Sequence, residues 1–156
     1  MNGVYSSLKD RNPSPSTARL LADLVPPREF ERASFENYIP HSEFPSQAEA
    51  SKAAQSFALG KTAKRGLFSR GPVETDSLGI YLDGGFGVGK THLLAATYHQ
   101  FRGKKAFGSF IAFTSLIGAL GFAAAKEALA RYALICIDEF ELDDPGDTMI
   151  MSRLLN

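Results

Sequence analysis

The sequence has only one cysteine, carries no net charge and contains no long uncharged apolar stretch. The single cysteine, Cys136, excludes a disulfide within the chain, and its position inside an apolar segment favours a small core residue. Lysine and arginine together number 17, as do aspartate and glutamate, which gives no sign of general polyanion binding. We therefore expect a globular cytoplasmic protein with no membrane span and no secretory signal.

A glycine-rich segment from Gly84 to Thr91 fits the spacing G-x-x-x-x-G-K-[ST] of phosphate-binding loops. Glycines allow successive backbone N–H groups to turn inward around a phosphate, where side chains would obstruct them. Lys90 is expected to reach the β- and γ-phosphates of a nucleoside triphosphate, and the Thr91 hydroxyl to bind Mg²⁺. A plain glycine-rich turn is disfavoured, because an apolar segment, the loop, the Lys-Thr pair and a helical pattern follow one another. The expected nucleotide-binding residues are Gly84, Gly85, Phe86, Gly87, Val88, Gly89, Lys90, Thr91 and His92.

The apolar run at residues 133–139, which ends in two carboxylates, is the candidate for the other half of the site. Such a run is typical of a buried parallel strand, whose C-terminal edge then carries the acids beside the phosphate loop. We expect Asp138 to hold Mg²⁺ and Glu139 to polarise the attacking water, with Glu139 and Lys90 as the catalytic residues. A strand ending in Asp-Glu is weak evidence alone, but after a phosphate loop it indicates a nucleotide hydrolase.

The chain beyond the loop alternates between strand and helix patterns. We expect strands at residues 78–82, 109–113 and 133–139, and helices after the loop and at residues 123–131 and 147–155. A further helix containing Ile117 and Leu120 is expected to be capped by Thr114 or Ser115. Alternation of this kind predicts an α/β fold with a parallel sheet and flanking helices.

Two helices are expected before the loop, at residues 17–24 with Ser16 as N-cap and at residues 46–59. Residues 1–33 form a polar, proline-marked extension, and residues 34–156 form the main domain. Within that domain, residues 34–77 flank a nucleotide-binding core at residues 78–156. The basic connector at residues 61–77 is interpreted as a solvated loop rather than a partner-binding patch.

Three segments together resemble the ZapE/Afg-type ATPases of the AAA+ class. These segments are residues 34–40 (Ser-Phe-Glu-Asn-Tyr-Ile-Pro), the loop with His92, and residues 136–147 (Cys-Ile-Asp-Glu-Phe-Glu-Leu-Asp-Asp-Pro-Gly-Asp). The resemblance implies an ATPase that uses ATP and Mg²⁺ and forms homo-oligomers. It also implies a protein partner in cell division or protein quality control, and a place in the cytoplasm or at the inner membrane without spanning it. By the same resemblance, residues 35–40 and Gln47 lie near the adenine, although Phe35 and Tyr38 equally suit simple packing onto the core.

Members of this family continue well beyond the length of this chain, so the expected AAA+ sheet is incomplete at the C-terminus. The resemblance then implies an N-terminal portion without the arginine finger and the helical lid, and hence poor packing and little turnover. Two alternatives stay open at this point. One is a nucleotide-binding fragment that does not hydrolyse ATP. The other is a DNA-associated ATPase of the helicase-loader type, which the balanced charge disfavours.

Overall fold

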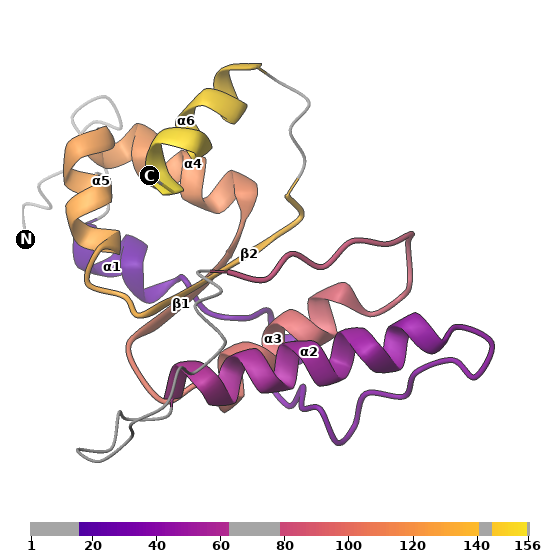
Figure 1. The fold of residues 1–156 in the computed structure, drawn as a ribbon. Coiled ribbons are helices and arrows are strands. Elements are labelled where there is room, and N and C mark those ends of the chain that lie inside the picture. Colours follow the sequence, from indigo (N-terminus) through magenta and orange to yellow (C-terminus); the bar gives the residue numbers. More distant parts are fainter. Residues whose placement is uncertain (1–15, 63–78, 141–144, 156) are drawn as a thin grey trace, which may run out of the picture.

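The computed structural model describes residues 16–62, 79–140 and 145–155, in which helices surround a small parallel sheet (Figure 1). Helices α2 and α3 lie on one side of the strands, and α4, α5 and α6 lie on the other (Figure 1). In chain order the elements are α1 (Thr17–Ala22), the 3₁₀ helix η2 (Arg28–Phe30), α2 (Pro45–Thr62), α3 (Lys90–Gln100), β1 (Lys105–Ser109), α4 (Phe110–Leu120), α5 (Phe122–Leu129), β2 (Leu134–Asp138) and α6 (Pro145–Leu155).

Strands β1 and β2 pair in parallel, with Lys105 opposite Leu134 and Ser109 opposite Asp138. Successive side chains of a strand point to opposite faces, so β2 supplies both layers of the core. Leu134 and Cys136 pack on the α3 side, whereas Ile135 and Ile137 contact the α4–α5 side. This arrangement explains why the strand is a continuous apolar run rather than an alternating one. The strand predicted at residues 133–139 is found at Leu134–Asp138, and the α/β fold class is confirmed.

The core consists of two clusters, one on each face of the sheet. The cluster under α4 and α5 is formed by Leu24, Ala106, Phe113, Leu116, Ile117, Ala125 and Leu129. The cluster under α3 is formed by Ala33, Ala95, Phe101, Phe107, Leu134 and Cys136. Cys136 is only 2% exposed, as expected of a core residue. Burial raises its pKa to about 12, so the thiol stays neutral at physiological pH.

The N-terminal segment also contacts the sheet. The backbone N–H of Phe107 donates to the carbonyl of Leu24 at 3.0 Å, on the edge of β1 that β2 does not occupy. Ser16 caps α1 as expected, because its hydroxyl accepts from the backbone N–H of Arg19. Leu24 and Ala33 of the expected polar extension are therefore buried in the core, while the domain division at residue 33 stays a prediction.

The prediction of a strand at residues 109–113 is wrong. The strand lies earlier, at Lys105–Ser109, and Phe110 begins α4. The Ser109 hydroxyl accepts from the N–H of Ala112 and so takes the capping role that we assigned to Thr114 or Ser115. Within the apolar run after Ser109, Phe110 and Phe113 lie three residues apart on the buried face of the helix, whereas Ile111 is 70% exposed.

The predicted strand at residues 78–82 is also not found. Residue 78 lies outside the described residues, and residues 79–82 form no strand. Tyr81 is 73% exposed, which a buried strand would not allow. A strand requires a neighbouring strand, and the sheet of the described residues consists of β1 and β2.

The remaining elements differ from expectation mainly at their ends. α2 is longer than predicted, and α3 ends at Gln100, with Phe101 as its C-cap. Gly121, at φ 78°, separates α4 from α5 and permits the sharp change of direction. Residues 63–77 of the expected connector lie outside the described residues. No helix in the described part of the chain has both the length and the apolar character that a membrane span requires.

Candidate nucleotide-binding site

The glycine-rich loop lies immediately before α3, whose first residue is Lys90. Gly87 and Gly89 have φ values of 75° and 84°, in the left-handed region that favours glycine. Gly89 precedes the helix, and its carbonyl accepts from the N–H of Leu93 at 3.0 Å as the first turn forms. The loop glycines thus direct the chain into a helix whose N-terminus is a ready anion-binding position.

The Lys90 ammonium group lies across the loop. Its Nζ donates to the carbonyls of Gly84 and Gly85 at 2.6 and 2.7 Å. The adjacent Asp83 carboxylate accepts from the Gly84 N–H at 2.7 Å. Lys90 therefore already sits within the loop, held by neutral oxygens that phosphate oxygens, being charged, would replace with stronger bonds.

The two predicted Mg²⁺ ligands meet at the C-terminal end of β2. The Thr91 hydroxyl, on the first turn of α3, donates to Asp138 Oδ1 at 3.2 Å. These residues are 47 positions apart in the chain, and both side chains are partly buried. The structure therefore brings the loop and the strand together at a hydroxyl and a carboxylate, which are hard oxygen ligands suited to Mg²⁺.

Glu139 follows directly and is exposed. Its φ of 51° is the only positive value at a non-glycine residue in the described chain. The next residue, Phe140, packs edge-on against the buried Phe110, with ring centroids 5.5 Å apart. Among the described residues, the Lys90 ammonium group bonds to the loop carbonyls rather than to the carboxylate of Glu139, the other predicted catalytic residue.

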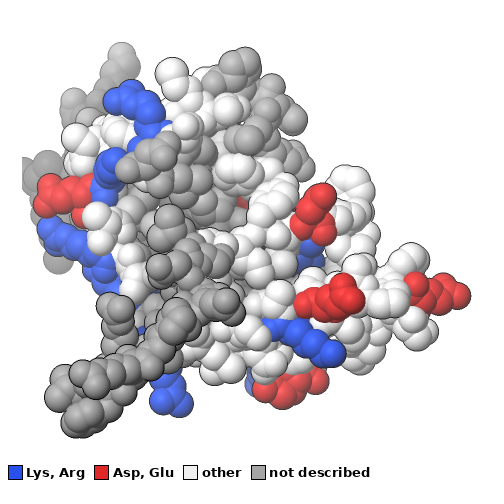
Figure 2. Space-filling view, viewed as in Figure 1, with Lys and Arg blue, Asp and Glu red and all other residues white. Residues whose placement is uncertain are grey.

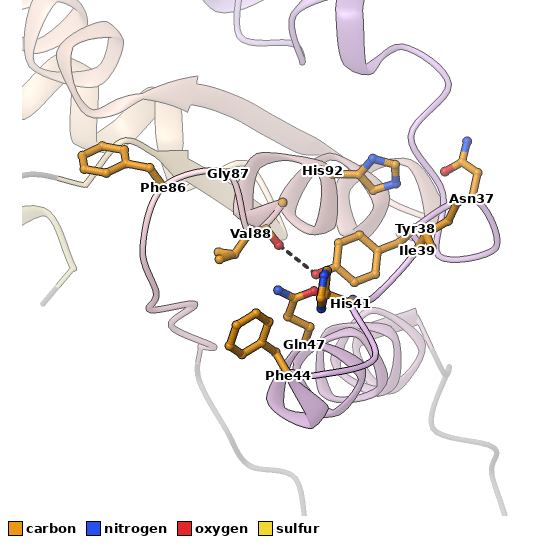
Figure 3. A pocket seen from close by; sticks show the side chains of 11 residues that line it. Asn37, Tyr38, Ile39, His41, Phe44, Gln47, Phe86, Gly87, Val88 and His92 are labelled. Carbon is orange, nitrogen blue, oxygen red and sulfur yellow. Dashed lines mark hydrogen bonds between the residues drawn. The ribbon is translucent and has the colours of Figure 1, made fainter.

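A pocket of about 530 Å³ adjoins the loop on its other side (Figure 3). One wall is the end of the loop and the start of α3, and the other is the segment that leads into α2. Its lining residues are Asn37, Tyr38, Ile39, His41, Phe44, Gln47, Phe86, Gly87, Val88, Gly89 and His92. Aromatic side chains and amide groups at one pocket suit a flat heterocyclic base.

Hydrogen bonds fix the pocket wall that precedes α2. The Gln47 side-chain oxygen accepts from the backbone N–H of His41 at 2.8 Å. The Tyr38 hydroxyl donates to the carbonyl of Val88 at 2.8 Å, and His92 Nε2 lies 3.0 Å from the carbonyl of Ser34. His92, predicted as a nucleotide-binding residue, thus holds this wall to α3, whereas the exposed Phe86 ring lies at the far side of the loop (Figure 3).

Three contacts of the site were missed by sequence reasoning. These are the bond from Tyr38 to Val88, the bond from Gly84 to Asp83, and the packing of Phe140 on Phe110. The acid beside the first loop glycine was a visible signal for the second contact. The other two join residues distant in the chain, and no local pattern marks them.

The parallel strands, the glycine loop at a helix N-terminus and the Thr–Asp contact together define a P-loop NTPase-like protein. The sequence model of the AFG1-like ATPase family matches residues 14–156. The chain belongs to this family, which confirms the resemblance noted above and implies ATPase function in general. No curated protein and no solved structure matched the chain.

Proposed function

We propose that this chain binds Mg·ATP in the loop from Gly84 to Thr91 and hydrolyses its terminal phosphate. The observation that carries the proposal is the 3.2 Å hydrogen bond between Thr91 and Asp138. It joins the phosphate loop to the acidic end of β2, which is the combination that phosphoryl-transfer sites require. A glycine-rich turn with a purely structural role would not require a contact with a carboxylate at the end of a buried strand.

Lys90 and the N-terminus of α3 would bind the phosphates. The ammonium group would leave the carbonyls of Gly84 and Gly85 for phosphate oxygens, exchanging neutral acceptors for anionic ones. The backbone N–H groups of the loop would complete the cradle. Both contributions favour a polyanion, although the chain as a whole has no net charge.

Thr91 and Asp138 would hold Mg²⁺, since one hydroxyl and one carboxylate match the few protein ligands that this ion uses beside phosphate oxygens. The ion supplies neutralisation of the charge that develops on the phosphates. Glu139 would accept a proton from the attacking water. Its exposed position at the end of β2, directly after Asp138, places the carboxylate where water has access.

The pocket beside the loop would take the adenine base. Phe44 and Tyr38 offer aromatic surfaces, and Gln47 is already oriented by the backbone of His41. The biological role follows from the family resemblance: remodelling of a protein partner in cell division or protein quality control. The same resemblance supports a homo-oligomer that acts in the cytoplasm or peripherally at the inner membrane.

Two alternatives remain distinct from this proposal. A nucleotide-binding chain without turnover would bind ATP but leave it intact. A helicase-loader-like ATPase would show salt-dependent DNA binding. Among the described residues on the face drawn in Figure 2, Asp and Glu lie as well as Lys and Arg, in keeping with the balanced charge of the chain.

Lys90→Ala tests the binding site. The substitution deletes charge-assisted bonds to phosphate, each worth about 1.5–3 kcal/mol, so the Kd for ATP should rise by about 10–100-fold. Lys126→Ala, which removes the same charge from the exposed face of α5, is the matched control. Titration with a fluorescent ATP analogue measures both. Equal affinity of the wild type and Lys90→Ala would exclude the proposed site.

A further inference from the structure

Tyr38 makes a contact that adenine binding does not require. Its hydroxyl donates to the backbone carbonyl of Val88 at 2.8 Å, across 50 positions of the chain (Figure 3). Val88 belongs to the phosphate loop, whereas Tyr38 belongs to the segment before α2. The bond therefore joins the wall of the base pocket directly to the part of the loop that would face phosphate.

The geometry of the peptide unit gives this bond a consequence. The carbonyl of Val88 and the N–H of Gly89 belong to one planar trans peptide and point in opposite directions. A hydroxyl that holds the carbonyl on the pocket side therefore holds the Gly89 N–H pointing away from it. The carbonyl of the following peptide is also fixed, because Gly89 accepts from Leu93 in the first turn of α3.

The Tyr38 ring packs against the bare backbone of Gly89. A methyl group in place of the glycine hydrogen would lie 2.6 Å from Tyr38 Cε2, far inside the contact distance of two carbons. Gly89 is thus needed twice, once for its φ of 84° and once for the close approach of the ring. Burial raises the pKa of Tyr38 above its ordinary value near 10, so the hydroxyl keeps its proton and remains a donor at neutral pH.

The segment that carries Tyr38 is itself well fixed. Ser34 and Asn37 exchange two hydrogen bonds, from Ser34 N–H to Asn37 Oδ1 at 2.8 Å and from Asn37 N–H to Ser34 Oγ at 3.2 Å. The Asn37 amide also donates to the carbonyl of Arg32 at 2.8 Å. His92 Nε2 lies within hydrogen-bond distance of the carbonyl of Ser34, so the first turn of α3 also holds this segment.

From these contacts we propose that Tyr38 is a positioning residue for the phosphate loop, acting through the peptide between Val88 and Gly89. The inference deepens the proposed function and rests on it. Tyr38 sets the direction of a loop N–H that receives phosphate. The binding of a base in the pocket and the binding of phosphate in the loop then depend on the same side chain.

Base-free polyphosphate separates this role from base stacking. Tyr38→Phe keeps the ring and removes the hydroxyl. The loss of one neutral hydrogen bond should weaken binding of Mg·tripolyphosphate and of Mg·ATP by the same factor, about two- to tenfold. Tyr81→Phe removes a hydroxyl from a tyrosine that is 73% exposed, and it should change neither affinity. Isothermal titration calorimetry measures ATP, and competition against a fluorescent nucleotide measures tripolyphosphate.

A second measurement requires no ligand. In the nucleotide-free chain, the ¹H–¹⁵N amide signal of Gly89 should shift in Tyr38→Phe, while that of Gly108 in β1 stays in place. Thermal unfolding of the same sample shows whether the variant remains folded. If Tyr38 had a merely structural role, the melting temperature would fall and many amide signals would shift, with no larger shift at Gly89 than elsewhere.

The outcomes separate the two proposals. Wild-type chain that binds neither ATP nor tripolyphosphate overturns the proposed function and this inference with it. Wild-type binding that Tyr38→Phe leaves unchanged overturns only the inference. A variant that loses affinity for ATP but keeps its affinity for tripolyphosphate also overturns it, because the hydroxyl would then serve the base. Equal losses for both ligands, together with a local shift at Gly89, support it.

Discussion

Asp138→Asn distinguishes a metal ligand from a residue that serves only the fold. In the structure, Asp138 Oδ1 accepts a hydrogen bond of 3.2 Å from the Thr91 hydroxyl. Asparagine has the same shape and presents an amide oxygen to the same donor. The bond is long and partly solvated, so its change from a charged to a neutral acceptor should alter the free energy of unfolding by less than about 1 kcal/mol.

The effect on nucleotide binding should change sign with the metal. With Mg²⁺ present, the variant lacks a charged oxygen ligand, and the affinity for ATP should fall by about 10–100-fold, as when a group supporting a metal is lost. Without Mg²⁺, the wild-type carboxylate repels the phosphates. At about 8 Å in a dielectric near that of water, this repulsion is on the order of 0.5–1 kcal/mol. Asp138→Asn should then bind metal-free ATP about two- to fivefold more tightly.

Fluorescent-nucleotide titrations in Mg²⁺ and in EDTA test both signs on the same samples. Asp83→Asn is the matched control, because it makes the same change of charge at the start of the loop, where the carboxylate accepts from Gly84. The control should tighten metal-free binding but keep the enhancement by Mg²⁺. An Asp138→Asn variant with the full enhancement by Mg²⁺ would refute the assignment of Asp138 to the metal.

Three further predictions follow from catalysis, packing and protonation. Glu139→Gln should leave ATP affinity unchanged but slow single-turnover hydrolysis by about 10²-fold or more, and an unchanged rate would exclude it as the activating residue. Phe113→Ala should lower the free energy of unfolding by about 3–5 kcal/mol in a denaturant titration, because Phe113 is fully buried, whereas Phe86→Ala at an exposed ring should have little effect. The Cys136 thiol, with its pKa raised to about 12, should resist alkylation at pH 8 until the chain unfolds. Because the native state keeps this proton longer than an unfolded thiol with a pKa near 9, stability should fall as the pH rises from 9 toward 12.

The phosphate loop and the strand that ends at Asp138 have strong local signals in the sequence. The loop spacing determines where Lys90 and Thr91 lie, and a continuous apolar run ending in acids determines where Asp138 lies. Thr91 and Asp138 meet at 3.2 Å because α3 packs against β2, which brings the first turn of the helix beside the C-terminal end of the strand. The assignment of roles to these residues stays a prediction until the variants are measured.

The misplaced strand shows where local patterns fail. The apolar run from Phe110 to Phe113 fits a short strand and the start of a helix equally well. The true strand contains Lys105 and Gly108, which are poor strand formers. Tertiary contacts decide between them: the Lys105 amine donates to the carbonyl of Phe101 at 2.9 Å, and Gly108 leaves room for Leu24 and Phe113. No single-sequence pattern reports such contacts.

The backbone at Glu139 connects the conformation of the site to its proposed chemistry. A left-handed conformation costs a non-glycine residue about 1–2 kcal/mol, and such strain persists only where the surroundings impose it. Here both neighbours are held: Asp138 by the Thr91 hydroxyl, and Phe140 by the buried ring of Phe110. Glycine at position 139 would relieve the strain but would remove the carboxylate. The chain therefore retains an acid where the backbone favours glycine, which is expected if the carboxylate acts at the end of β2.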